Sequence, residues 1–117
     1  MIIKDYFCVH FINQLVKYNP NLTDLVLYRK NFAQDLYLVD TIKLETLDVK
    51  FNQTATLYLG SNFSLRSITS NCRVDLASAM PNLREINFKK GYRPGKDESE
   101  RLLLMACQLK KLSCTGI

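Results

Sequence analysis

The sequence has no tryptophan and only one histidine, and it lacks the groupings of residues that catalysis requires. An active site needs a nucleophile with a base and an orienting partner, or a set of metal ligands. His10 follows Cys8 by two positions, a spacing that puts the two side chains on different faces of a helix. Neither a glycine-rich phosphate loop nor a G-x-S-x-G motif occurs. We therefore expect no catalytic residue, no cofactor and no enzymatic activity.

The cysteines do not form a pattern typical of a metal site. The four, Cys8, Cys72, Cys107 and Cys114, contain no CxxC pair and no spacing that includes the histidine. We predict that no metal is bound and that the cysteines are small buried apolar residues. His10 is expected on a helix surface.

Long hydrophobic runs are also missing. No stretch reaches the about 18 apolar residues that a membrane span needs, and the first residues lack the basic and then apolar order of a secretory signal. Three N-x-S/T triplets, at Asn21, Asn52 and Asn62, do not by themselves establish secretion. We expect no membrane span and an intracellular location, in the cytoplasm or nucleus.

The formal net charge of +5 raises the alternative of a nucleic-acid partner. The only dense basic stretch is residues 89–96, and Gly91, Pro94 and Gly95 indicate that it is a loop. A solvated loop explains this stretch better, so nucleic acid is the less favoured partner.

A six-residue motif recurs along the 117 residues, which are predicted to form a single domain, 1–117. It reads Leu, two residues, Leu or Ile, one residue, then usually an apolar residue, and it begins at Leu22, Leu44, Leu65, Leu83 and Leu109. Each copy can form a short strand whose alternate side chains share one face. Because one copy cannot bury its apolar face alone, we expect the five strands to stack in sequence order as a parallel sheet.

The segments between the motifs are expected to carry the chain from the end of one strand back to the start of the next. Helical spacing of apolar residues predicts an amphipathic helix over 8–16, a weaker one over 32–39 and one or two helical turns over 76–83, whereas alternation predicts extended chain over 55–59. A last helix is predicted to begin with Asp97 as its cap and Glu100 reaching back, with an inner face formed by Leu102, Met105, Ala106 and Leu109.

These five motifs, with phrases such as Met80-Pro81-Asn82-Leu83-Arg84, resemble the leucine-rich-repeat superfamily, in its ribonuclease-inhibitor-like and F-box-associated branch. The resemblance implies an α/β fold: a right-handed solenoid with a short parallel sheet on the concave side and helices or irregular segments on the convex side. It implies a protein–protein interaction module and, as one role, substrate recognition in an F-box-type ubiquitin ligase, although no F-box is present. The alternative is an extracellular ligand-binding repeat domain; the paired flanking cysteine clusters usual in that class are not seen here.

One position of the repeat departs from the family pattern. The resemblance implies Asn or Cys at the ninth place, bonded to backbone inside the turn, and only the second copy keeps it, as Asn52. The other copies have Lys30, Arg73, Gly91 and Ile117. Asn52 is therefore expected to be buried, and so unable to carry a glycan.

The strand residues between the leucines are expected to face outward in three columns, which would form the partner-binding surface of such a solenoid. The first column is Asp24, Thr46, Ser67, Glu85 and Lys111, the second is Val26, Asp48, Thr69, Asn87 and Ser113, and the third is Tyr28, Lys50, Asn71, Lys89 and Thr115. Tyr28 is the favoured contact residue because tyrosine is enriched at interface hot spots. A merely solvated sheet face is the alternative.

The C-terminal repeat lacks a polar capping unit after its leucines. An open end exposes apolar surface together with a strand edge, which favours self-association. We therefore expect a slice of a longer solenoid, or a chain that pairs through this end.

Overall fold

Strands of two parallel sheets alternate along most of the chain, and a helix stands near each end. The computed structural model describes residues 1–5, 7–38, 43–60, 62–76, 80–89, 92–105 and 107–114. The elements are β1 (Ile2–Lys4), α1 (Val9–Lys17), β2 (Asp24–Tyr28), β3 (Leu36–Tyr37), β4 (Thr46–Lys50), β5 (Thr56–Tyr58), β6 (Ser67–Ser70), β7 (Arg73–Asp75), β8 (Glu85–Phe88), α2 (Lys96–Leu104) and β9 (Lys111–Cys114).

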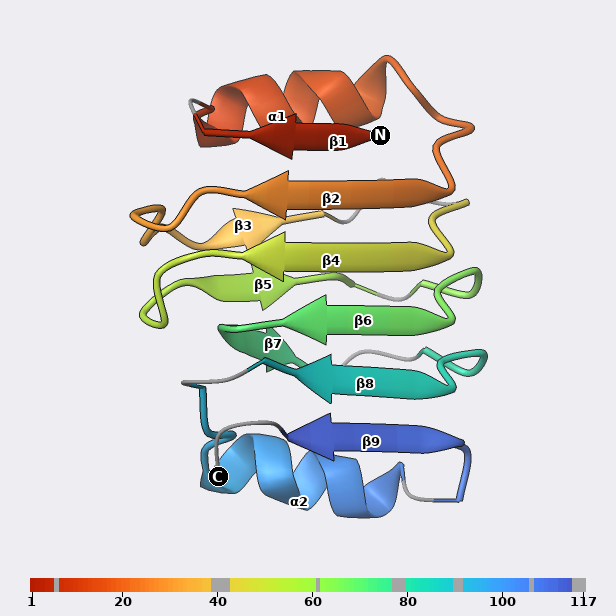
Figure 1. Ribbon diagram of the computed structural model, residues 1–117. Helices are drawn as coiled ribbons and strands as arrows, with labels where there is room; N and C mark the ends of the chain where they lie inside the picture. Colours follow the sequence, from red (N-terminus) through yellow and green to blue (C-terminus); the bar gives the residue numbers. More distant parts are fainter. Residues whose placement is uncertain are drawn as a thin grey trace.

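The larger sheet has six strands in the order β1-β2-β4-β6-β8-β9, and the smaller has the order β3-β5-β7. Every pairing in both sheets is parallel. The smaller sheet lies behind the larger one, with α1 beside β1 and α2 beside β9 at opposite ends of the stack (Figure 1). The five predicted strands are thus present, parallel and in sequence order. Strand β1 was not predicted, because Ile2-Ile3-Lys4 has no copy of the leucine motif.

The core lies between the two sheets. From the larger sheet, Leu25 and Leu27 of β2 and Leu47 of β4 point inward, with at most 2% of each residue exposed. Leu57 of β5 and Val74 of β7 meet them from the smaller sheet and are fully buried. Burial of each such side chain contributes about 1.5–3 kcal/mol, so the motif leucines are the main source of stability.

A second set of buried residues is aromatic and lies just past the carboxyl ends of three strands of the larger sheet. Phe7 follows β1, Phe32 follows β2 and Phe51 follows β4. The ring centroids of Phe7 and Phe32 are 5.4 Å apart, and those of Phe32 and Phe51 are 4.7 Å apart. Ring packing at these distances adds to area burial, and it fixes the loops at this edge of the sheet.

The predicted first helix is confirmed, although its buried face is narrower than expected. Ile12 and Val16 are buried, whereas Phe11 is 46% exposed and Cys8 is an exposed N-cap residue. His10 is exposed on this helix, as predicted.

The last helix is confirmed as well, but its predicted cap is wrong. The N-cap of α2 is Gly95, which has no side chain to bond, and Asp97 lies inside the first turn. A carboxylate there still interacts favourably with the helix dipole. Leu102 is buried, as predicted. The rest of the predicted inner face is only partly right, because the helix ends at Leu104 and Met105 and Leu109 are only partly buried. Ala106 lies outside the described residues.

The expected secondary structure of the connecting segments is only partly right. The predicted helix over 32–39 is wrong, because Leu36 and Tyr37 form β3 and pair with β5. The extended chain predicted over 55–59 is confirmed as β5. Of the helical turns predicted over 76–83, residues 77–79 lie outside the described residues, and 80–83 are not helical. Pairing within the smaller sheet therefore overrides the weak helical pattern of 32–39.

The expected burial of Asn52 is wrong. Asn52 is exposed, and its Oδ1 accepts hydrogen bonds from the backbone N and the hydroxyl of Thr54, at 3.0 and 2.9 Å. These bonds stabilise only a local turn, so burial is no argument against a glycan at this residue. Asn62 is the buried sequon residue instead, at 4% exposure, and it accepts from the backbone N of Leu65 at 3.0 Å.

The cysteines differ in burial. Cys72 is fully buried, as predicted, but Cys8 and Cys107 are exposed, which contradicts the expectation that all would be core residues. The side chain of Cys114 lies outside the described residues.

Several leucines at the C-terminal end of the stack are uncovered. Leu103 and Leu104 of α2 are 76% and 75% exposed, and Leu112 of β9 is 49% exposed. Self-association through this end stays a prediction.

Candidate partner-binding surface

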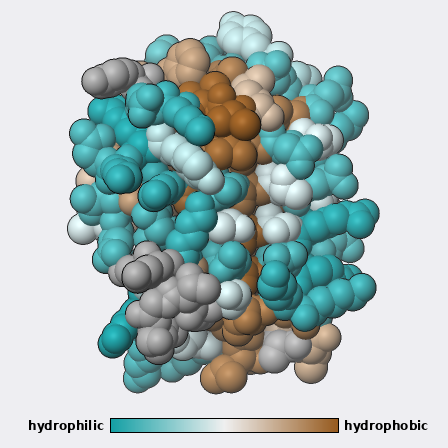
Figure 2. Space-filling model, in the orientation of Figure 1, coloured by the Kyte–Doolittle hydropathy of each residue, from teal (hydrophilic) through white to brown (hydrophobic). Residues whose placement is uncertain are grey.

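One face of the six-stranded sheet packs on the core, and no described element covers the other, which we call the open face (Figure 1). The burial pattern of β2 and β4 alternates accordingly, with the leucines and Val49 buried and their neighbours partly or fully exposed. Figure 2 shows mostly hydrophilic side chains on this face, with a hydrophobic band between them. A parallel sheet is usually covered on both sides, so this open face is unusual.

The strand register confirms the predicted columns as far as the paired residues extend. Asp24 pairs with Thr46, and the first column continues through Ser67 and Glu85 to Lys111. The second column runs from Val26 through Asp48, Thr69 and Asn87 to Ser113, and β1 adds Ile2 to it. In the third column β1 adds Lys4 beside Tyr28, which pairs with Lys50. Thr115 lies outside the described residues.

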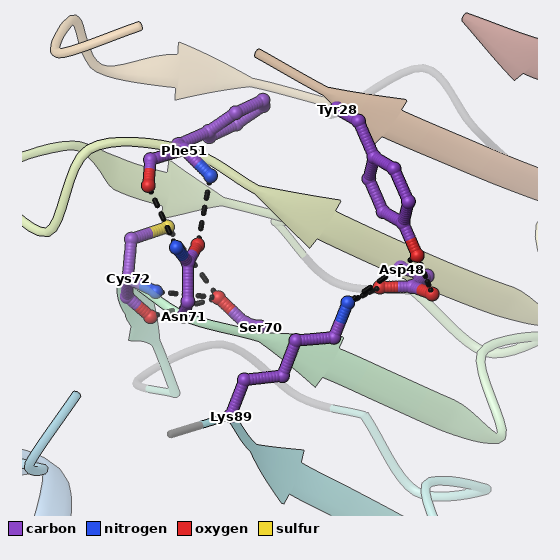
Figure 3. A network of polar contacts seen from close by, with 7 residues as sticks. All are labelled: Tyr28, Asp48, Phe51, Ser70, Asn71, Cys72 and Lys89. Carbon is purple, nitrogen blue, oxygen red and sulfur yellow. Dashed lines mark hydrogen bonds and ion pairs between the residues drawn. The ribbon is translucent and has the colours of Figure 1, made fainter. Parts of the chain in front are cut away.

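Three of the predicted residues form a polar cluster on the open face: Tyr28, Asp48 and Lys89 (Figure 3). The Tyr28 hydroxyl donates to Asp48 Oδ2 at 2.8 Å, and Lys89 Nζ lies 2.8 Å from Asp48 Oδ1. The same ammonium group lies 3.3 Å from the Tyr28 hydroxyl oxygen and 4.7 Å from its ring centroid. Lys89 follows β8 and Asp48 is on β4, so the lysine side chain reaches across β6.

The electrostatics of the cluster favour its charged form. Burial by itself lowers the pKa of Lys89, but the hydrogen bonds and charge of Asp48, together with Tyr28, outweigh burial and raise that pKa. The side chains of Lys89 and Asp48 are 28% and 32% exposed. This is therefore a partly desolvated ion pair whose geometry is fixed before any partner arrives.

Asn71, another predicted contact residue, is bonded to the backbone of the neighbouring chain segment. Its amide donates to the Phe51 carbonyl and its Oδ1 accepts from the Phe51 backbone N, both at 2.7 Å (Figure 3). It thereby occupies both backbone groups of a residue just after the neighbouring strand β4. Asn71 therefore has a structural role, and its expected contact with a partner stays a prediction.

The first column has an exposed carboxylate, Asp24, on β2 and an ion pair between Glu85 on β8 and Lys111 on β9. Asp24 is exposed, and hydrogen bonds from Thr46 and then Thr23 lower the pKa of its carboxyl group. Lys111 Nζ lies 3.5 Å from Glu85, an exposed pair of the kind that contributes little to stability. Asp24 therefore keeps its negative charge available to a partner.

The side-chain carbonyl oxygen of Asn87, in the second column, is shielded from solvent and has no hydrogen-bond partner within the described residues. A polar atom without a partner costs about 1–3 kcal/mol. Among the described residues, this oxygen is therefore a buried acceptor without a partner, and its burial keeps it out of reach of a ligand on the open face.

The chain was compared with family models, curated proteins and solved structures. None of the three comparisons gives a match. Among the described residues, no helix is long and apolar enough to cross a membrane, and no group of three His, Cys, Asp or Glu side chains is placed to hold a metal ion.

Sequence reasoning missed a buried polar group behind the open face, between β7 and α2. Glu98 is only 4% exposed; it accepts a hydrogen bond from the Tyr92 hydroxyl, and its Oε2 accepts from the backbone N of Val74 at 3.0 Å. Burial and the adjacent Glu98 raise the pKa of Tyr92 well above its usual value. The contact fastens α2 to the smaller sheet. Glu98 lies among charged helix residues, so its sequence context gives no sign of burial.

The buried thiol nearby is not suited to nucleophilic chemistry. Burial raises the pKa of Cys72 to about 11, so its sulfur is protonated at neutral pH. Ser70, which replaces an apolar residue of the third motif, donates to the Cys72 carbonyl at 2.8 Å and accepts from its backbone N at 3.0 Å (Figure 3). These contacts close the turn that joins the two sheets.

Proposed function

We propose that this chain forms a right-handed leucine-rich-repeat solenoid, and that it binds a protein partner on the open face of its six-stranded sheet. Support for the repeat fold comes from the strand order and the near-uniform register. Each strand of the larger sheet pairs with residues about one repeat later, such as Asp24 with Thr46, and the chain returns through the smaller sheet. In this proposal the open face is the concave side.

The observation that carries the binding function is the preformed cluster of Tyr28, Asp48 and Lys89 on a sheet face that nothing described covers. Fixing these side chains in advance lowers the entropy lost when a partner binds. Tyrosine is also enriched at interface hot spots. Ile2 and Val26 add apolar surface beside the cluster.

A catalytic function is not proposed. The groups whose pKa values shift most, Tyr92 and Cys72, are buried and bonded to structural neighbours. One version of this proposal is substrate recognition within an F-box-type ubiquitin ligase. In that version the F-box, which binds the adaptor, would not be part of the repeats described here.

The proposal is tested by blocking the open face without touching the core. Thr69→Arg places a long charged side chain at the centre of the face, and Gln34→Arg adds the same charge on an exposed bend between β2 and β3. Proteins captured from cells by the wild type are quantified for both variants, and each hit is then tested as a purified protein.

We expect at least one direct partner to be lost with Thr69→Arg and kept with Gln34→Arg, with both variants folded by circular dichroism. If every purified partner binds the two variants equally well, the open face is not the binding surface.

A further inference from the structure

A pocket of about 530 Å³ adjoins the open face where β1, β2 and β4 end. Its polar lining consists of Lys4, Asp5, Arg29, Lys30, Asn31 and Lys50. Tyr28 also lines the pocket, and it is a member of the polar cluster described above. A ligand in the pocket would therefore lie next to the favoured contact residue.

The pocket is strongly positive. Four cationic side chains and one carboxylate line it, and none of these cations has an ion-pair partner within the residues that the structure describes. Lys4 and Lys50 flank Tyr28 in the strand register, and the Lys4 ammonium lies 5.6 Å from the Tyr28 ring centroid. Like charges that line one pocket repel one another, and a bound anion relieves that repulsion.

Arg29 is held in place for such a ligand. One of its terminal N–H groups donates to the Phe7 carbonyl, and its Nε donates to Asn31 Oδ1 at 3.2 Å. Its guanidinium carbon lies 5.9 Å from the Phe7 ring centroid, and Phe7 belongs to the buried aromatic set. A guanidinium group has five N–H donors, so donors remain after these bonds are made.

We propose that this pocket binds the dianionic phosphate monoester of a phosphorylated peptide. A phosphate monoester carries about −1.5 to −2 charges and three strong acceptor oxygens, which suits several cationic donors. A single carboxylate would leave most of the positive charge unneutralised. The inference names the chemistry of the partner at the open face, and it rests on the proposed function for that role.

The charges beyond the pocket favour a peptide over a nucleic acid. Asp24 lies four residues before Tyr28 on the same strand, which is about 13 Å at about 3.3 Å per residue. Glu85 lies in the same column as Asp24, across β4 and β6. A polyanion laid across the face would meet these carboxylates, whereas a peptide with one phosphate and basic residues about 13 Å away complements both ends.

The test uses nuclear magnetic resonance titration of the whole chain with four probes at fixed ionic strength: a short phosphoserine peptide with a lysine on one side, its unphosphorylated form, inorganic phosphate, and a ten-residue oligothymidylate. We expect saturable shifts of the Arg29, Lys30 and Lys50 amides with the phosphopeptide. The unphosphorylated peptide should give none.

Two double variants distinguish binding in the pocket from nonspecific attraction to the positive charge of the protein. Lys4→Gln with Lys50→Gln removes two pocket cations, and Lys17→Gln with Lys96→Gln removes two exposed lysines from the helices. Loss of two charge-assisted contacts should weaken the phosphopeptide about tenfold or more, and the helix pair should change it by less than about twofold.

Equal weakening by both pairs would overturn the proposal, as would the absence of saturation. If inorganic phosphate binds with the same affinity as the phosphopeptide, the pocket holds an adventitious ion only. If the oligonucleotide binds more tightly than the phosphopeptide, the pocket is a nucleic-acid site. Either result overturns the proposed peptide ligand. Failure here leaves the open face to be judged separately by Thr69→Arg, so the two proposals fail independently.

Discussion

Replacing Asn71 by alanine should destabilise the protein far more than its half-buried position implies. The substitution removes two hydrogen bonds of 2.7 Å and leaves both backbone groups of Phe51 without these partners. Phe51 is only 2% exposed, and each buried backbone group left unpaired costs about 1–3 kcal/mol. Because Asn71 itself is half-buried, water can enter partly, and we expect a total loss of about 2–3 kcal/mol.

The assay is urea unfolding followed by far-ultraviolet circular dichroism, together with a thermal scan. At about 4 °C per kcal/mol for a domain of this size, the melting temperature should fall by about 8–12 °C. Asn52→Ala is the matched control, since it removes an exposed side chain whose hydrogen bonds within the described residues go to Thr54; its cost should stay below about 1 kcal/mol. If Asn52→Ala lowers the free energy of unfolding as much as Asn71→Ala, the stabilising role assigned to the hydrogen bonds between Asn71 and Phe51 is refuted.

The other predictions concern the core, the ion pair and the buried thiol. Leu47→Ala, at a position 2% exposed, should lower the free energy of unfolding by about 3 kcal/mol in the same urea assay. A double-mutant cycle of Lys89→Met and Asp48→Asn should give a coupling of about 1 kcal/mol that shrinks in high salt, and zero coupling would contradict the cluster. Because burial raises the pKa of Cys72 from 9.0 to about 11, the unfolded thiol ionises first, so stability should fall between these pH values. The fall should be shallower in Cys72→Ala and unchanged in Cys8→Ala, as measured by unfolding at a series of pH values.

The parts of the fold that the sequence predicts well are those encoded by repetition. The leucine motif marks all five strands at the right places, because alternation within six residues is a strong local signal for one buried face. The three strands of the smaller sheet are two or three residues long, too short for a periodic signal. Only Thr56–Tyr58 shows alternation, and only that strand was predicted as extended chain.

The candidate site shows the same division. The columns follow from strand register, so residues such as Tyr28 and Asp48 could be placed on one face from their position in the motif. The reach of Lys89 over β6 could not be predicted, since it depends on how the sheet brings non-adjacent strands together. The turn of Asn71 towards Phe51, one residue beyond its strand, depends likewise on tertiary packing.

The Lys89 contacts have a consequence for the order of folding events. Pairing of successive strands closes loops of similar length, as between Asp24 and Thr46, so every step has nearly the same entropic cost. The contacts of Lys89 with Asp48 and Tyr28 span 41 and 61 residues and require β2, β4 and β8 to be in place. We expect these contacts to form only after the intervening strands have assembled, that is, after the transition state for folding. Disruption of this cluster should therefore speed unfolding while leaving the rate of folding nearly unchanged.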